Sequence, residues 1–127
     1  MPAKRKPDFP AVHARLKAIM QRYATGTLQP QHDVPEHYVL TGPPTERSQG
    51  REVWFGAVRT GKAYVSYHLM AVYAFPDLLD GMSPALKKRM QGKSCFNFRE
   101  VDEKLFKELA RLTERGYKRF RREKLIA

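Results

Sequence analysis

Cysteine and long apolar runs are scarce in this chain of 127 residues. Cys95 is its only cysteine, which excludes a disulfide framework within the chain and fits a reducing compartment. The longest uncharged stretch, residues 63–76, is too short to span a bilayer, and no apolar segment follows the basic first residues. We therefore expect a cytoplasmic protein with no membrane partner.

Acidic residues are also few, so the chain is strongly basic. The 24 Lys and Arg residues outnumber the 13 Asp and Glu residues, for a net charge of +11. Residues 87–127 alone hold fourteen basic and six acidic residues, a net charge of +8. A positive field of this kind favours nucleic acid, anionic lipid or phosphorylated ligands, but it also serves solubility. Both explanations stay open at this point.

One globular domain is expected over residues 8–127, because this length and 42% hydrophobic content suffice for a core without disulfide or metal staples. Residues 1–7 predict a disordered basic tail. A helix should begin after Asp8 and run to about residue 24, since apolar residues recur there at helical spacing. A second long helix should follow Asp102, with acidic residues in its first turn and basic ones toward its end.

The segments between these helices predict short strands and turns. In order, the sequence favours a polar connector over 27–35, a strand over 37–41, an exposed loop over 42–50, a helical turn over 77–80, a helix over 84–90 capped by Ser83, and a strand over 93–98. The predicted fold class is α+β. It is a single small domain in which an antiparallel sheet with a central hairpin packs against the N-terminal and C-terminal helices.

The most informative stretch is Val53 to Phe75, which contains six of the fourteen aromatic residues. Thr60-Gly61 predicts a two-residue turn, so that Val58 would face Ala63. Strand alternation then assigns one face to the core: Trp54, Val58, Ala63, Val65, Tyr67, Leu69, Ala71 and Tyr73. The opposite face carries Val53, Phe55, Arg59, Lys62, Tyr64, Ser66, His68 and Met70. This second face is either covered by a helix or left as a partly wet binding surface.

A phosphate-binding loop is excluded within the same stretch. Residues 56–62 have the G-x-x-x-x-G-K spacing, but Ala63 stands where Ser or Thr should reach the metal. The residues that follow alternate like a strand, whereas a phosphate-binding loop opens a helix. Nucleotide hydrolysis is therefore not expected.

Ligand-binding candidates lie on the mixed face of the hairpin and on the strand that follows. They are Phe55, Tyr64, Ser66, His68 and Cys95. An enzyme centred on His68 and Cys95 is a further hypothesis, because Lys93 and Arg99 point to the same side of the strand as the thiol and would lower its pKa. It ranks lowest, since no paired general acid and base can be named.

The basic C-terminal segment supplies the candidates for polyanion binding. They are Arg115, Lys118, Arg119, Arg121, Arg122 and Lys124. These cations would neutralise phosphates while Tyr117 and Phe120 stack on exposed bases. In the alternative interpretation both aromatic residues pack inward from a helix and the cations are only solvated, which their spacing of three supports.

One local cluster has metal-ligating residue types. His32, Asp33, Glu36 and His37 lie within six residues. Pro35 interrupts the cluster, so it cannot be placed on one helix face, and an exposed polar loop is the preferred interpretation. No metal or cofactor is predicted.

Residues 54–120, taken as an ordered set, resemble the YdhG-like family of small bacterial domains. The resemblance rests on the segments GKAYVSYHLMAVY, GKSCFNF and VDEKLF. It implies a compact α+β fold with helices against an antiparallel sheet, and no catalytic residues come with it. A relative with a frataxin-like iron-chaperone role would imply an acidic face, whereas this chain is basic. Trp54-Phe-Gly-Ala also stands where many relatives have Trp-Gly-x-Pro.

These observations favour a non-catalytic binding or accessory module over an enzyme. Its expected partner is a small ligand or a protein, which the outer face of the central hairpin would bind. Polyanion binding by the C-terminal segment, with nucleic acid as the partner, is the alternative.

Overall fold

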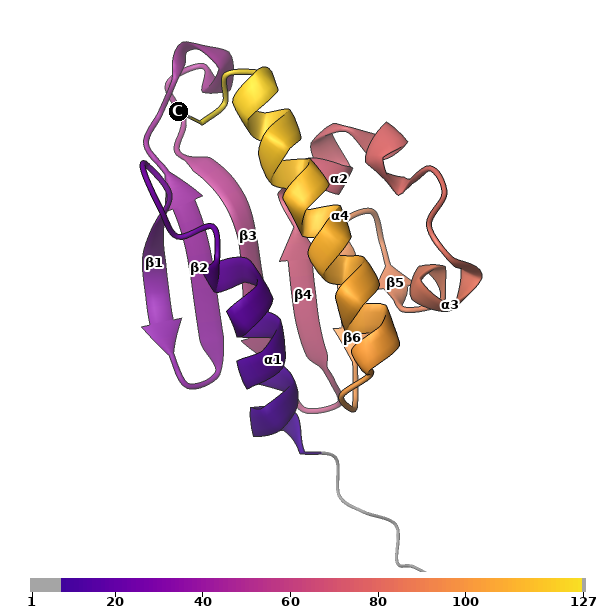
Figure 1. Cartoon of the computed structure of the whole chain (residues 1–127). Helices are drawn as coiled ribbons and strands as arrows, with labels where there is room; N and C mark the ends of the chain where they lie inside the picture. The colour runs from indigo at the N-terminus through magenta and orange to yellow at the C-terminus, as the bar shows by residue number, and fades with distance from the viewer. Residues whose placement is uncertain (1–7, 127) are drawn as a thin grey trace, which may run out of the picture.

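Two long helices cover one face of a six-stranded antiparallel sheet in the computed structural model, which describes residues 8–126 (Figure 1). The predicted basic tail, residues 1–7, lies outside the described residues. The strands are β1 (Gln29–Val34), β2 (His37–Gly42), β3 (Val53–Thr60), β4 (Val65–Leu69), β5 (Met90–Gln91) and β6 (Cys95–Phe98), in the order β1-β2-β3-β4-β6-β5. The long helices are α1 (Phe9–Gln21) and α4 (Glu103–Arg122). The protein is a single small α+β domain, as the sequence predicted.

Short helices and 3₁₀ turns lie in the connections between the strands. They are α2 (Met70–Ala74) and α3 (Pro84–Lys87), with 3₁₀ turns η1 (Glu46–Ser48) and η2 (Pro76–Leu79). The predicted turn near residues 77–80 is confirmed, and the predicted loop over 42–50 holds only the η1 turn. The helix expected to reach residue 90 ends at Lys87, because Met90 has joined the sheet beside β6. None of the helices in the described residues combines the length and apolar character needed to span a lipid bilayer.

Side chains close in sequence set the helix starts. The Asp8 carboxylate accepts the Ala11 N–H at 3.1 Å, and the Asp102 carboxylate accepts the Leu105 N–H at 3.1 Å. The Ser83 hydroxyl accepts the Leu86 N–H of α3 at 3.1 Å. Each bond satisfies one of the N–H groups that have no partner inside the first turn of a helix. The predicted caps are therefore confirmed.

The core lies between the helices and the sheet. Its centre is aromatic: the Phe55 ring meets the rings of Tyr117 and Phe120 nearly edge-on, at centroid distances of 6.1 and 5.7 Å. The buried Tyr67 hydroxyl lies 2.7 Å from the Thr113 hydroxyl, which itself donates to the Leu109 carbonyl at 2.8 Å. Tyr67 is therefore the donor, and this bond ties the middle of the sheet to α4.

The turn of the central hairpin differs from the prediction. Thr60 pairs with Val65 and Val58 pairs with Tyr67, so the connection spans residues 61–64 rather than two residues. The loop closes through the Gly61 N–H, which donates to the Tyr64 carbonyl at 2.9 Å. The observed pairing of Val58 with Tyr67 is displaced by four positions from the predicted pairing of Val58 with Ala63. Because side chains alternate with a period of two, this even displacement leaves Tyr67 on the core face as predicted.

A bulge in β3 overturns part of the predicted face assignment. Leu40 pairs with Gly56 but Thr41 pairs with Trp54, which leaves Phe55 as an extra residue in β3. An extra residue of this kind makes two neighbouring residues face the same side of a sheet. Phe55 consequently points into the core with no exposed surface, while Trp54 points outward. The expectation that Trp54 belongs to the core and Phe55 to the ligand face was wrong.

Two other segments also depart from the sequence expectations. The strand predicted to continue to residue 75 ends at Leu69, where α2 begins, so Tyr73 leaves the predicted core face. The polar connector over 27–35 contains β1, an edge strand whose six residues are all exposed. It pairs with β2 through backbone hydrogen bonds, and a polar sequence can form these bonds without alternating apolar and polar residues.

A buried histidine should make stability depend on pH. His13 of α1 is only 4% exposed, and its Nδ1 lies 3.1 Å from the Thr60 hydroxyl, while its Nε2 has no hydrogen-bond partner among the residues that the structure describes. Burial is the main cause that lowers the pKa of His13. The positive charges of Lys17 and His37 lower it further, and the negative charges of Asp33 and Glu36 oppose them.

We expect the free energy of unfolding to fall as the pH drops from about 7 to 5. The unfolded histidine binds its proton near pH 6.5, before the folded one does, so acid favours the unfolded state. Urea titrations of the protein and of His13→Met across this range measure the effect. The variant should show a shallower pH dependence, and the remainder should come in part from His37 and His68, whose pKa values burial also lowers. An unchanged slope in His13→Met would contradict this assignment.

Candidate functional site

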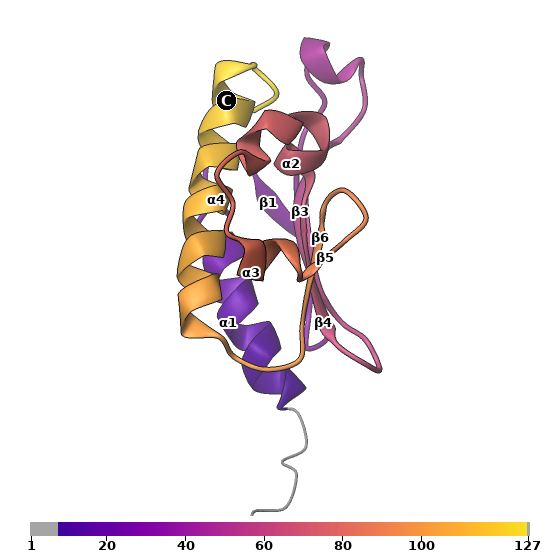
Figure 2. The same ribbon diagram turned by 90° about the vertical axis from the view of Figure 1, so that its right-hand side faces the viewer.

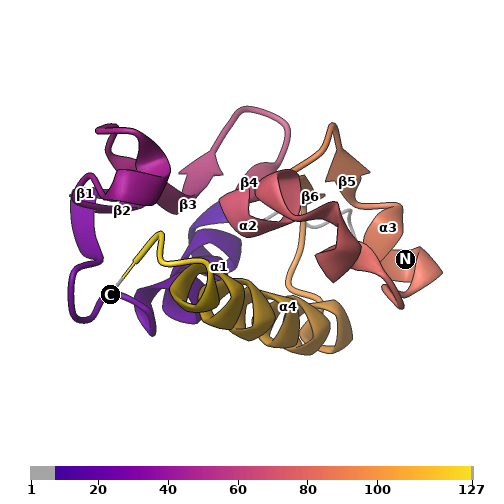
Figure 3. The same cartoon turned by 90° about the horizontal axis from the view of Figure 1, so that it is seen from above.

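The face of the sheet that points away from α1 and α4 carries a broad hollow. Figure 2 shows the sheet edge-on, with both long helices on one side, and Figure 3 shows the same layers from above. The hollow has a volume of about 440 Å³ and lies over β2, β3, β4 and α2. Its lining residues are His37, Trp54, Ala57, Arg59, His68, Met70, Tyr73 and Ser94. In the part of the chain that the structure describes, the outer hairpin face thus forms an open surface.

Strand pairing explains why the hollow forms at this place. Ala57 pairs with Val39 on one side and with His68 on the other, so the smallest side chain of the row forms the floor. Arg59 lies one step along the same face and pairs with His37 and Ser66. The bulge brings Trp54 to the opposite end, and α2 adds Met70 and Tyr73.

The lining combines exposed rings with one charged group. Trp54 is 38% exposed and Tyr73 is 56% exposed. Arg59 is the only Lys, Arg, Asp or Glu side chain in the lining, and it has no ion pair with the described residues. Burial lowers the pKa of His68. Burial also lowers the pKa of His37, and the nearby His32 and Arg59 lower it further, so both imidazoles are favoured in the neutral form at neutral pH. The hollow therefore presents apolar rings around a single positive charge.

The predicted ligand residues do not all reach this hollow. His68 lines it, whereas Tyr64 and Ser66 line a neighbouring hollow of about 350 Å³ around the hairpin loop, and Arg59 borders both. Cys95 pairs with His68 across β4 and β6 and is half-buried. Phe55 belongs to the core on the other side of the sheet and is removed from the candidates.

A hydrogen-bonded network occupies the polar groups around Asn97. Its side-chain oxygen accepts from the Ser66 hydroxyl at 2.9 Å and from the Cys95 thiol at 3.3 Å. The Asn97 amide donates to the Gln91 side chain at 2.8 Å, which also accepts from the Tyr64 hydroxyl at 3.3 Å. These contacts hold β4, β5 and β6 together, so they leave fewer free groups for a ligand than the sequence suggested.

The environment of Cys95 does not activate the thiol. Burial is the main cause that raises its pKa, and the neighbouring Ser66 hydroxyl opposes this only in part. The His68 ring has the Ser94 hydroxyl as its hydrogen-bond partner, 3.4 Å from Nδ1, and no carboxylate of residues 8–126 bonds to the imidazole. A thiol is a nucleophile only as the thiolate. The geometry thus offers no support for Cys95 as a nucleophile.

Sequence reasoning missed several residues of the hollow. Arg59 and Met70 were on the correct face but were not singled out, and His37 was considered only as a metal ligand. Trp54 and Tyr73 were assigned to the core, because the bulge and the start of α2 follow from long-range packing. A signal was available for Arg59, since it is the one charged residue within β3.

The candidate metal cluster forms the hairpin between β1 and β2 rather than a loop. The rings of His32 and His37 stack at a centroid distance of 5.5 Å, and Asp33 forms an ion pair with Lys17. Within residues 8–126, no group of three or more His, Cys, Asp or Glu side chains is arranged to hold a metal ion.

The C-terminal aromatic residues face the core. Tyr117 packs on Tyr23 at 4.8 Å between ring centroids, and Phe120 is buried. Both rings therefore pack inward, as one of the two interpretations predicted, and they do not offer a surface on which exposed bases could stack. The reason is that both residues belong to α4, whose apolar stripe continues to its last turn.

Three of the predicted polyanion-binding residues have partners in the protein. Arg119 forms ion pairs with Asp77 at 2.8 Å and Glu123 at 2.9 Å, and its guanidinium lies over the Phe75 ring. Lys118 pairs with Glu114 at 3.0 Å, and Arg115 donates to the Leu78 carbonyl. No described acidic group pairs with the remaining three: Arg121, Arg122 and Lys124.

Comparison with known proteins adds no assignment. No family model, no curated protein and no solved structure matches the chain. The resemblance to the YdhG-like family therefore stays a prediction. The site is defined by the geometry and the chemistry of the chain's own residues.

Proposed function

We propose that the protein is a non-catalytic binding module of the YdhG-like kind that holds a small planar organic anion in the outer hollow. The observation that carries the proposal is the lining itself, in which Trp54 and Tyr73 expose their rings and Arg59 supplies one cation. A cytoplasmic location belongs to the same proposal and rests on the single cysteine.

The exposed rings support a planar partner. Aromatic side chains that stay open on a sheet face leave apolar surface in water, and a flat ligand that covers them recovers part of that free energy. The volume of about 440 Å³ also lies within the range of small-molecule sites. Ala57 leaves room above the strands that any larger residue would fill.

Arg59 supports a negative charge on the ligand. Its guanidinium has no acidic partner in the described residues and can bind a carboxylate through two parallel hydrogen bonds. The neutral state favoured for His37 and His68 leaves the hollow without a second strong cation. One carboxylate on an aromatic ring matches this distribution of charge.

Trp54 offers a direct measurement because it is the only tryptophan. Benzoate should shift its single indole N–H resonance in a proton–nitrogen correlation spectrum, and benzamide, which has the same ring without the charge, should bind at least about tenfold more weakly. Arg59→Gln should remove this preference. The matched variant Arg99→Gln, at an exposed arginine outside the hollow, should keep it.

A blocking variant tests the location independently. Ala57→Leu should fill the floor and abolish the benzoate-induced shift while the fold, followed by circular dichroism, persists. Native mass spectrometry of the purified protein should also reveal a copurifying acid. The proposal is wrong if benzoate and benzamide shift the Trp54 resonance equally, or if Arg59→Gln and Arg99→Gln behave alike.

A further inference from the structure

A stripe of basic residues runs along the outward side of α4. Its members are Lys104, Lys107, Arg111, Arg115, Lys118 and Arg122. They recur every three or four residues, so they fall within an arc of about 80° and extend over about 27 Å of helix. Figures 2 and 3 show α4 on one side of the sheet, and the outer hollow lies on the other side. We refer to these six residues as the α4 stripe.

The acidic residues of α4 are mostly engaged away from the stripe. Glu103 holds Arg15 of α1 through two hydrogen bonds, and Glu108 accepts the Ser83 N–H and hydroxyl at 2.8 and 2.6 Å. Only Glu114 pairs with a stripe residue, Lys118. Among the described residues, no acidic side chain pairs with the other stripe members. The stripe therefore keeps most of its positive charge.

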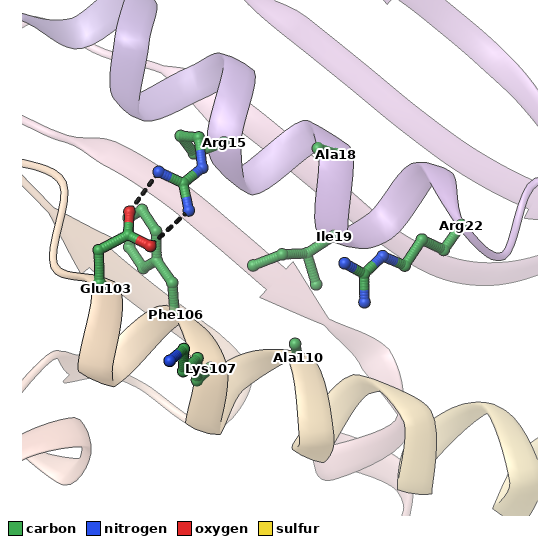
Figure 4. Close-up of a pocket in the computed structure, with 8 residues that line it drawn as sticks. All are labelled: Arg15, Ala18, Ile19, Arg22, Glu103, Phe106, Lys107 and Ala110. Atoms are coloured by element: carbon green, nitrogen blue, oxygen red, sulfur yellow. Dashed lines mark hydrogen bonds and ion pairs between the residues drawn. The ribbon is translucent and has the colours of Figure 1, made fainter.

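A groove between α1 and α4 widens this positive surface. Figure 4 shows that Arg22 extends toward α4 near Ala110, while Lys107 and the paired Arg15 lie at the other end. The groove has a volume of about 240 Å³, and the small side chains of Ala18 and Ala110 keep it open. Arg22 has no ion pair in the described residues. Arg22 therefore adds a cation to the same groove that Lys107 lines.

We propose that the α4 stripe docks on the phosphate backbone of double-stranded nucleic acid. The charges are complementary, and the straight helix presents them in a row along which phosphates also follow one another. Tyr117 and Phe120 pack inward, so the stripe lacks the aromatic rings on which single-stranded bases stack. No large apolar residue lies among the six cations to enter a lipid surface.

This surface should bind duplexes of different sequence alike. Arginine and lysine on a ridge reach phosphates rather than base edges, and phosphate contacts carry no sequence information. Neutralising about five phosphates predicts that affinity falls roughly a few hundred-fold between about 50 and 200 mM salt. The proposal is independent of the outer hollow.

The test measures binding of the full chain to a fluorescein-labelled DNA duplex of about 20 base pairs by anisotropy, at several salt concentrations. The variant Lys107→Gln/Arg111→Gln should weaken binding at least about tenfold and reduce the slope of log K against log salt by about two. The control Lys62→Gln/Lys93→Gln removes the same charge from exposed positions outside α4 and should change affinity less than about twofold.

Two further probes decide against other partners. A single strand of the same length and vesicles of phosphatidylserine and phosphatidylcholine should both bind more weakly than the duplex. Tighter binding to either one, through the stripe, overturns the proposal. Equal losses in the two double variants also overturn it, because net charge alone would then explain the binding. If duplex binding is absent or does not depend on the salt concentration, the proposal is also overturned.

Discussion

Replacing Phe55 with Ala should destabilise the protein by about 3–5 kcal/mol, the range typical for removal of a buried aromatic side chain. Phe55 has no exposed surface and contacts three aromatic rings: Tyr23, Tyr117 and Phe120. These rings come from the turn that follows α1 and from α4, so the cavity would open between the helical layer and the sheet. Urea unfolding followed by circular dichroism measures the loss.

The neighbouring residue provides the control. Trp54→Ala removes a larger side chain, but one that lies on the opposite face and is 38% exposed. It should cost about 1 kcal/mol or less, because the side chain has few core contacts to lose. If Trp54→Ala proved more destabilising than Phe55→Ala, the two residues would have to face the other way and the bulge would be absent.

Gly56→Ala should cost about 3 kcal/mol, although the change adds a single methyl group. A Cβ at this position would lie 2.5 Å from the His68 carbonyl oxygen and 2.4 Å from the Met20 methyl group. The Met20 side chain can move, but the carbonyl belongs to the neighbouring strand and can move only with β4. A glycine inside a strand often marks such a close approach.

Gly61→Ala is the matched comparison, since it makes the same chemical change in the hairpin loop. The nearest atom to its added Cβ would be the Tyr64 carbonyl oxygen at 3.4 Å, an ordinary contact. This variant should change the free energy of unfolding by less than about 0.5 kcal/mol. Similar losses in Gly56→Ala and Gly61→Ala would show that strand flexibility, and not the contact with β4, limits position 56.

The two proposed surfaces belong to different layers of the molecule. The outer hollow lies on the sheet, and the α4 stripe lies on the helical layer, with the core between them (Figure 2). A small anion and a duplex therefore need not compete for the same residues. Arg59→Gln should leave duplex binding unchanged, and the stripe variant should leave the benzoate-induced shift unchanged.

Elements that depend on neighbouring residues were predictable from the sequence. Asp8, Ser83 and Asp102 cap their helices as expected, because a cap is a contact between residues three apart. The core positions of Tyr67 and Leu109 followed from period-two and helical patterns. Edge strand β1 was not predictable in this way, since its exposed polar residues carry no apolar alternation.

The candidate site was only partly predictable. His68, Ser66 and Tyr64 were placed on the outer side of the sheet, because the four-position displacement of the hairpin was even. The full lining of the hollow was not predictable. The position of Tyr73 depends on where α2 begins, and the direction of the Trp54 side chain depends on the bulge. Three of the six residues of the α4 stripe were predicted as part of the basic C-terminal segment, and helical spacing extends the stripe back to Lys104.

The sequence by itself determined the α+β class, the two long helices with their caps, the excess of basic charge and the aromatic hairpin at the centre of the sheet. Only the tertiary structure decided that Phe55 enters the core while Trp54 faces the hollow. The extra residue in β3 is set by its pairing with β2 and by the space that Gly56 leaves for Met20. These contacts join residues far apart in the chain, and one extra residue in a strand reverses the direction of every side chain beyond it.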